Sequence, residues 1–197
     1  MGRWRKYYVE DRRVWTSPPS LCARRAADVF KAQGKRVILD LGCGAGRDAV
    51  CLAEAGLTVV GTDIEDAGLA ILQRRIAERP ADVLPVRADA RRLPFSDAVF
   101  EGIYSFGLLH DFTSMERDAE VRQAMAEMHR TLQPGGLLVL AVLAGDFRFT
   151  LPDVYVFSEH MFRRATEDFT PVEIKQYDDI GCTGKTDYPI WYGVFLR

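Results

Sequence analysis

Residues 37–56 read VILDLGCGAGRDAVCLAEAG, and this stretch decides the fold class. An apolar run comes first, an amphipathic helical pattern begins near Arg47, and between them lie Gly42, Gly44 and Gly46. Glycine allows positive φ angles and lets a ligand approach the backbone closely. Amide groups at the start of a helix favour a polar or anionic ligand group. The stretch therefore predicts a buried strand, a ligand-binding loop and a helix in immediate succession.

From residue 36 onward, short apolar runs alternate with amphipathic stretches, which is typical of a doubly wound α/β fold with a mostly parallel sheet. Five strands are expected, at residues 36–41, 57–63, 82–88, 98–105 and 137–143. Helices are expected at residues 20–33, 66–79, 116–132 and 158–164. The run Pro134, Gly135 and Gly136 is expected to lead into the fifth strand. Two late runs, residues 171–177 and 190–196, are expected to pair as an antiparallel edge hairpin.

Length and composition exclude several classes of protein. The 197 residues suit one domain, which we assign to residues 20–197, behind an N-terminal arm of residues 1–19. No apolar run approaches the roughly 20 residues of a membrane-spanning helix. The first residues lack the apolar stretch of a secretory signal, so a cytoplasmic location is expected. The four cysteines form no C-x-x-C pair, so neither a metal site nor a redox dithiol is expected.

Two acidic residues end the strands that follow the glycine loop. Asp63 ends the run VVGTD, and a carboxylate there can accept hydrogen bonds from both hydroxyls of a ribose. Asp89 follows the third strand, where it can accept a hydrogen bond from an exocyclic amine such as that of adenine. Because parallel strands end at one edge of a sheet, these groups predict a crevice for a nucleoside-containing ligand.

The glycine spacing argues against two common nucleotide sites. Dinucleotide-binding loops read G-x-G-x-x-G, whereas here Arg47 stands where the third glycine would be, so a nicotinamide cofactor is disfavoured. A phosphate-binding P-loop is also disfavoured, because Gly184, Lys185 and Thr186 lack the preceding strand and loop.

The motifs taken together resemble the class I S-adenosylmethionine-dependent methyltransferases. They are DLGCGAG, VVGTD, the acid after the third strand, VFEGIYSFGLLH and LQPGGLLVL, in this order over residues 36–145. The resemblance implies a seven-stranded, Rossmann-like sheet with an antiparallel last strand. It also implies that the cofactor is S-adenosylmethionine and that the chain is a methyltransferase.

The resemblance assigns the cofactor-binding residues one by one. It implies that Asp63 holds the ribose, that Ile64 packs on adenine, and that Asp89 and the amide of Ala90 read the adenine edge. The methionine part is expected to lie among the residues of the glycine loop and the strand before it, namely Asp40, Gly42, Cys43, Gly44 and Gly46. Ser105, near the end of the fourth strand, completes the expected cofactor-binding set.

A narrower resemblance suggests the acceptor. Residues 46–69 and 90–95 resemble the small-molecule branch that includes the thiopurine and tellurite-resistance methyltransferases. In many members of that branch an N-terminal segment folds over the cofactor and builds the acceptor pocket. Tyr7, Tyr8 and Trp15, together with Phe106, are therefore expected to contact the acceptor. His110, after the fourth strand, is the candidate catalytic base or substrate contact.

The sequence also allows alternatives to small-molecule methylation. The arm is basic as well as aromatic, so an RNA or protein acceptor is possible, although a nucleic-acid partner is not expected. A cofactor-binding regulator without turnover is a further alternative. DNA-base methylation is disfavoured, because the fourth strand ends in YSFG where amino-methylating enzymes carry N-P-P-Y or D-P-P-Y. The sequence specifies neither the acceptor nor the oligomeric state.

Overall fold

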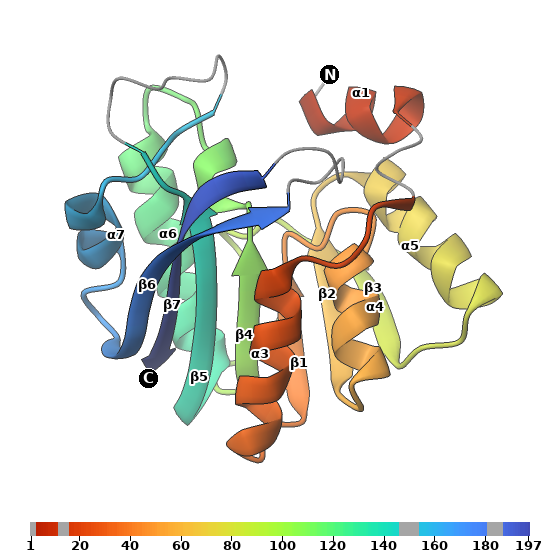
Figure 1. Ribbon diagram of the computed structural model, residues 1–197, viewed down its shortest axis with the longest axis horizontal. Helices are drawn as coiled ribbons and strands as arrows, with labels where there is room; N and C mark the ends of the chain where they lie inside the picture. The colour runs from red at the N-terminus through yellow and green to blue at the C-terminus, as the bar shows by residue number, and fades with distance from the viewer. Residues whose placement is uncertain (1–2, 12–15, 146–153, 181–186) are drawn as a thin grey trace.

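The computed structural model describes residues 3–11, 16–145, 154–180 and 187–197, and its centre is one seven-stranded sheet (Figure 1). The strand order is β3-β2-β1-β4-β5-β7-β6. All neighbours are parallel except for β7, which runs antiparallel to both β5 and β6. The strands are β1 (Val37–Leu41), β2 (Thr58–Asp63), β3 (Val83–Arg87), β4 (Phe100–Phe106), β5 (Leu132–Leu143), β6 (Thr170–Ile180) and β7 (Asp187–Leu196). The expected Rossmann-like sheet with an antiparallel last strand is confirmed.

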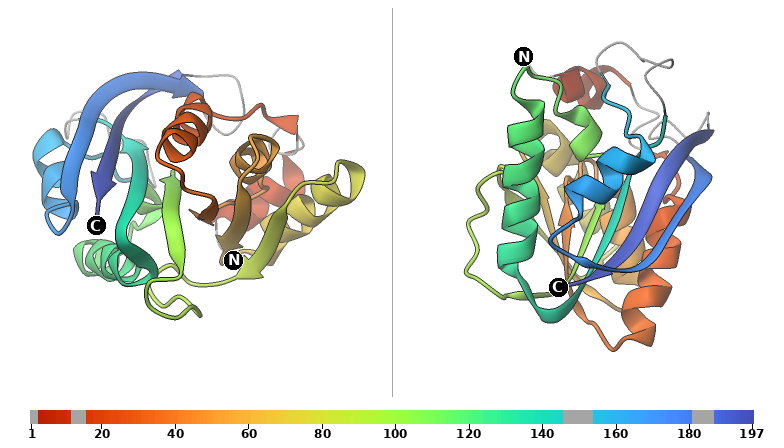
Figure 2. Two further views of the ribbon diagram at one scale, coloured as in Figure 1. Left: turned by 90° about the horizontal axis from the view of Figure 1, so that it is seen from below. Right: turned by 90° about the vertical axis from the view of Figure 1, so that its left-hand side faces the viewer.

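Helices cover both faces of this sheet (Figure 2). The helices are α1 (Arg3–Glu10), α3 (Leu21–Ala32), α4 (Arg47–Glu54), α5 (Asp66–Glu78), α6 (Arg117–Thr131), α7 (Glu159–Ala165) and the short 3-10 helix η1 (Leu109–Asp111). Helices α3, α4 and α5 pack on one face and α6 and α7 on the other, which gives two buried apolar clusters with the sheet between them. Of the described helices, none is long and apolar enough to cross a membrane.

The fifth strand differs from its expected extent. It begins at Leu132 instead of residue 137, because Leu132 already pairs with Phe100 of β4. Helix α6 accordingly ends at Thr131. Pro134 and Gly135 therefore lie inside the strand, beside a shift in register between β4 and β5. These turn-forming residues thus lie in an irregular part of β5. The pairing of β5 with β4 and β7 outweighs their local preference for a turn.

The N-terminal arm contains a helix that lies over the carboxyl edge of the sheet. Helix α1 packs against α5 (Figure 1). Tyr8, Ala45 and Ile71 form a small buried cluster between the arm, the glycine loop and α5, with Trp4 packed against it. The arm is therefore docked on the domain at the edge where the ligand crevice is expected.

Candidate active site

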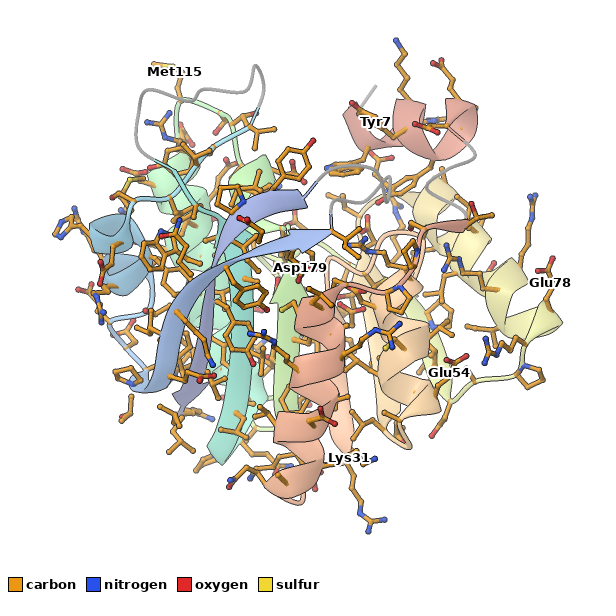
Figure 3. The ribbon with its side chains drawn as sticks, viewed as in Figure 1. Tyr7, Lys31, Glu54, Glu78, Met115 and Asp179 are labelled. Carbon is orange, nitrogen blue, oxygen red and sulfur yellow. The ribbon has the colours of Figure 1, made fainter. Side chains whose placement is uncertain are left out.

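A cavity of about 1030 Å³ opens at the carboxyl ends of β1, β2, β3 and β4, beneath helix α1. Most of the residues expected at the site line it, namely Tyr7, Tyr8, Asp40, Gly42, Cys43, Gly44, Asp63, Ile64, Asp89, Ala90, Phe106 and His110. Tyr7 on α1 and Asp179 near the end of β6, which also lines the cavity, are labelled in Figure 3. Residues from distant parts of the chain thus meet in one space, as the parallel topology requires.

The glycine loop has the backbone conformation that its sequence predicts. Gly42, Gly44 and Gly46 have φ angles of +82°, +53° and +76°, which residues with a side chain adopt only with strain. The amides of Gly42 and Cys43 both donate to the carbonyl oxygen of Thr62 on β2, at 2.8 and 2.9 Å. The loop is therefore held against the end of β2, where Gly42, Cys43 and Gly44 line the cavity.

Asp40 is a buried carboxylate that lacks a full set of donors. It lies one residue before the end of β1 with 2% of its surface exposed, and its Oδ2 accepts no hydrogen bond within the part of the chain that the structure describes. Burial raises the pKa of Asp40 well above its usual value, and the charges of Asp48 and Asp63 raise it further, whereas Arg47 lowers it. A buried polar atom without a partner is costly. Asp40 therefore has the chemistry to receive a cationic N–H donor from a ligand.

Asp63 is held rigidly at the end of β2. Its Oδ2 accepts a hydrogen bond from the amide of Gly44 and its Oδ1 accepts one from the amide of Glu65, both at 2.8 Å. Burial raises the pKa of Asp63, and these two hydrogen bonds oppose the rise. Because each carboxylate oxygen can accept more than one hydrogen bond, the fixed carboxylate can also receive two vicinal hydroxyls.

An exposed apolar side chain and an acidic side chain line the cavity after β2 and β3. Ile64, directly after β2, is 50% exposed although it is apolar, and a ligand ring in the cavity would cover it. Asp89, after β3, is hydrogen-bonded to the guanidinium of Arg91. These hydrogen bonds lower the pKa of Asp89. The hydrogen-bond acceptors Asp40, Asp63 and Asp89 therefore line the same cavity as the glycine loop.

The backbone of β5 fixes the ring of His110 at the cavity. It is buried in η1, and its Nδ1 accepts a hydrogen bond of 3.2 Å from the backbone amide of Leu143. Since a backbone amide can only donate, the neutral imidazole carries its proton on Nε2. Because Nδ1 already accepts this hydrogen bond, service of Nδ1 as a base would need a new arrangement of the ring.

The arm closes one side of the cavity. The Trp4 indole Nε1 donates to Oδ2 of Asp111, next to His110, and the rings of Trp4 and Tyr8 stack with centroids 5.9 Å apart. Tyr8 lies so close to the glycine loop that a Cβ on Gly44 would be 2.5 Å from its hydroxyl oxygen. The aromatic side chains of α1 therefore point toward the glycine loop and the cavity.

Two expected site residues do not line the cavity, and a third is not described. Gly46 does not line the cavity; a Cβ there would lie 2.3 Å from Cδ1 of Leu72, so this glycine lets α5 pack on the loop. Ser105 is buried and donates to the carbonyl oxygen of Leu41 at 2.9 Å, which ties β4 to β1 without lining the cavity. Trp15 lies outside the described residues.

Two further residues, Asp48 and Trp4, line the cavity although the sequence motifs do not include them. Asp48 accepts hydrogen bonds from the amide and hydroxyl of Ser20 and from the hydroxyl of Tyr104. Its partners are far away in the sequence, so no local pattern points to it. Trp4 did carry a signal, because it lies four residues before Tyr8 and so shares a helix face with it.

Comparisons with known proteins assign the chain to a family. Residues 39–140 match the family model described as "Methyltransferase domain". The chain belongs to the methyltransferase domain family. The expected membership of the class I S-adenosylmethionine-dependent methyltransferases is thereby confirmed.

The demethylmenaquinone methyltransferase of Thermus thermophilus is 37% identical over 120 residues, which are 59% of this chain and 51% of that protein. The chain spans about half the length of the curated relatives it matches.

Solved structures share the fold of this methyltransferase domain at low identity. The 1,6-didemethyltoxoflavin-N1-methyltransferase of Burkholderia thailandensis, bound to 1,6-didemethyltoxoflavin and S-adenosylhomocysteine, superimposes with a TM-score of 0.71 at 22% identity. That match covers 98% of this chain and 85% of the other. TehB from Haemophilus influenzae superimposes with a TM-score of 0.71 at 18% identity. That match covers 88% of this chain and 62% of the TehB chain. At these identities the likeness concerns the fold, so membership of the narrower branch stays a prediction.

Proposed function

We propose that this chain transfers the methyl group of S-adenosylmethionine to a small-molecule acceptor. One observation carries the proposal. Oδ2 of Asp40, which has no hydrogen-bond partner among the described residues, borders the same cavity as the fixed carboxylate of Asp63 and the glycine loop. The names of the relatives add support, because demethylmenaquinone and 1,6-didemethyltoxoflavin are small molecules.

The residues of this chain would divide the work of holding the cofactor. Asp40, beside the glycine loop, suits the charged methionine end, Asp63 suits the ribose, and Ile64 with Asp89 suits the adenine. When bound, S-adenosylmethionine supplies an electrophilic methyl group on a sulfonium centre. The protein contributes by orienting both reactants and by excluding water, for which the arm over the cavity is well placed.

The walls of the remaining cavity suit an apolar or aromatic acceptor. Several of them are aromatic or aliphatic, namely Trp4, Tyr7, Phe106, Leu143, Val154, Tyr188 and Ile190. His110 lines the cavity beside these walls and would contact a polar atom of the acceptor. Trp4 and Tyr8 pack inward, which favours a pocket-building arm over an arm that stacks the bases of a single-stranded nucleic acid.

Calorimetric titration tests the cofactor assignment. We expect S-adenosylmethionine to bind and NADH not to bind. Asp63→Ala removes the ribose acceptor and is expected to weaken S-adenosylmethionine binding by about tenfold or more. Tight NADH binding without binding of the sulfonium compound would contradict the proposal. A methyl-transfer screen over thiols, phenols, amines and metalloid oxyanions would then identify the acceptor class.

Removal of the arm tests its part in the site. Deleting residues 1–15 keeps Ser20, whose side chain caps α3, so the domain is expected to fold. We expect the affinity for S-adenosylhomocysteine to fall by about tenfold, because the aromatic wall is lost. Trp4→Phe, which removes only the donor to Asp111, is the milder matched variant. Unchanged affinity and unchanged acceptor turnover in the deletion variant would show that the arm is not part of the site.

A further inference from the structure

A network of charged side chains lies at the adenine end of the cavity, and Arg91 is its centre. Arg91 Nε donates to Asp89 Oδ1 at 2.9 Å, and Nη2 donates to Asp89 Oδ2 at 2.6 Å. The backbone amide of Arg91 donates to the same Oδ1, also at 2.9 Å. Three donors from one residue thus fix both the position and the rotation of the Asp89 carboxylate.

The same guanidinium reaches a second element. Arg91 Nη1 donates to Oε1 of Glu120 on α6 at 2.6 Å, and Oε2 of Glu120 accepts from the hydroxyl of Ser114 at 2.7 Å. Ser114 directly follows Phe112 and Thr113, which line the cavity. Arg91 therefore connects the loop after β3 with the segment before α6, and these two segments border the adenine end.

We propose that Arg91 is a positioning residue for nucleobase recognition: it holds Asp89 as an oriented acceptor, so that the cavity selects a purine with an exocyclic amine. This inference rests on the proposed function, because it concerns the adenine of the same cofactor. A carboxylate that is fixed as an acceptor pairs with an N–H donor and repels a carbonyl oxygen at the same place. The lowered pKa of Asp89 agrees with this role, since it keeps the carboxylate ionised.

A purely structural ion pair is the competing explanation. Arg91 and Asp89 are about one third exposed, and exposed pairs contribute little to stability. Such a pair would change neither the affinity for the base nor the preference between bases. The two explanations therefore differ in ligand discrimination, which can be measured without turnover.

The test compares S-adenosylhomocysteine with S-inosylhomocysteine, in which a carbonyl replaces the exocyclic amine. Kd values are measured by calorimetry for the full chain and for Arg91→Met. The matched control is Arg92→Met, which changes the adjacent, exposed arginine. We expect Arg91→Met to weaken binding of the adenosyl ligand by about tenfold and to reduce its preference over the inosyl ligand, and we expect Arg92→Met to change neither.

Arg91→Lys separates charge from geometry. Lysine keeps the positive charge but cannot form the forked contact, so we expect stability to be retained and the preference between bases to remain reduced. If Arg91→Met and Arg91→Lys keep both Kd values within about twofold of the original chain, the inference is wrong while the proposed function stands. If the original chain binds neither ligand, the proposed function fails and the inference fails with it.

Discussion

Replacing Asp40 by asparagine is expected to raise the free energy of unfolding at pH 8 and to weaken S-adenosylmethionine binding. Asp40 is buried near Asp48 and Asp63, and its Oδ2 accepts no hydrogen bond within the described chain. Asparagine removes the buried charge, so we expect a gain of about 1–3 kcal/mol. The same change removes the negative charge that a cationic donor would meet and replaces one accepting oxygen by an NH2 group, so the Kd is expected to rise by about tenfold or more.

The pH dependence of this effect has a definite sign. Because the pKa of Asp40 is raised in the folded state, folding favours the protonated carboxyl. Its stabilising contribution is complete below the unfolded pKa of about 4 and is lost as the pH rises through the folded pKa. The stability difference between Asp40→Asn and the original chain should therefore be small at pH 4 and grow with pH. Thermal unfolding across this range measures it.

Asp48 provides the control for this prediction. It is similarly buried, but its carboxylate accepts hydrogen bonds from the amide and hydroxyl of Ser20 and from Tyr104. Asp48→Asn loses charge-assisted hydrogen bonds and is expected to destabilise the fold by about 1.5–3 kcal/mol. The two variants should thus change stability in opposite directions. A destabilising Asp40→Asn with no dependence on pH would show that Asp40 is satisfied by other groups.

Local sequence patterns were sufficient for the central part of the fold. The glycine loop and the flanking β1 and α4 follow from an apolar run, three glycines and a helical pattern that are contiguous in the chain. The positions of Asp63 and Asp89 follow from the parallel order of β1, β2 and β3. These features depend on nearest neighbours in the sequence or on a general property of parallel sheets, so they could be predicted.

The contacts that complete the site could not be predicted, because they join distant segments. Trp4 reaches Asp111 across 107 positions, and the amide of Leu21 donates to Asp179 across 158 positions. Gly46 was expected to bind the cofactor, but its lack of a side chain serves packing against Leu72. A glycine in a loop motif shows that space is needed, and only the three-dimensional structure shows what fills that space.

The contact between Gly44 and Tyr8 leads to a prediction for a pair of substitutions. Gly44→Ala places a Cβ 2.5 Å from the Tyr8 hydroxyl oxygen, where the next ring atom, Cζ, is 3.4 Å away. Gly44→Ala also forces alanine into a left-handed conformation, which costs about 1–2 kcal/mol. We expect the single variant to displace α1, to lower stability by more than this strain, and to weaken S-adenosylhomocysteine binding.

Tyr8→Phe removes the oxygen that causes the clash and leaves an ordinary contact with the ring. In the combination of Gly44→Ala and Tyr8→Phe, the loss of stability should therefore be smaller than the sum of the two single losses, by about 1 kcal/mol or more. Gly34→Ala is the control that measures the stability lost to backbone strain alone. Gly34 has a φ of +66°, and nothing lies within 4 Å of its added Cβ. Additive losses in denaturant unfolding would mean that the arm does not rest on the glycine loop in solution. Coupled losses, accompanied by partial recovery of S-adenosylhomocysteine binding, would mean that the second glycine of the loop accommodates the arm as well as the cofactor.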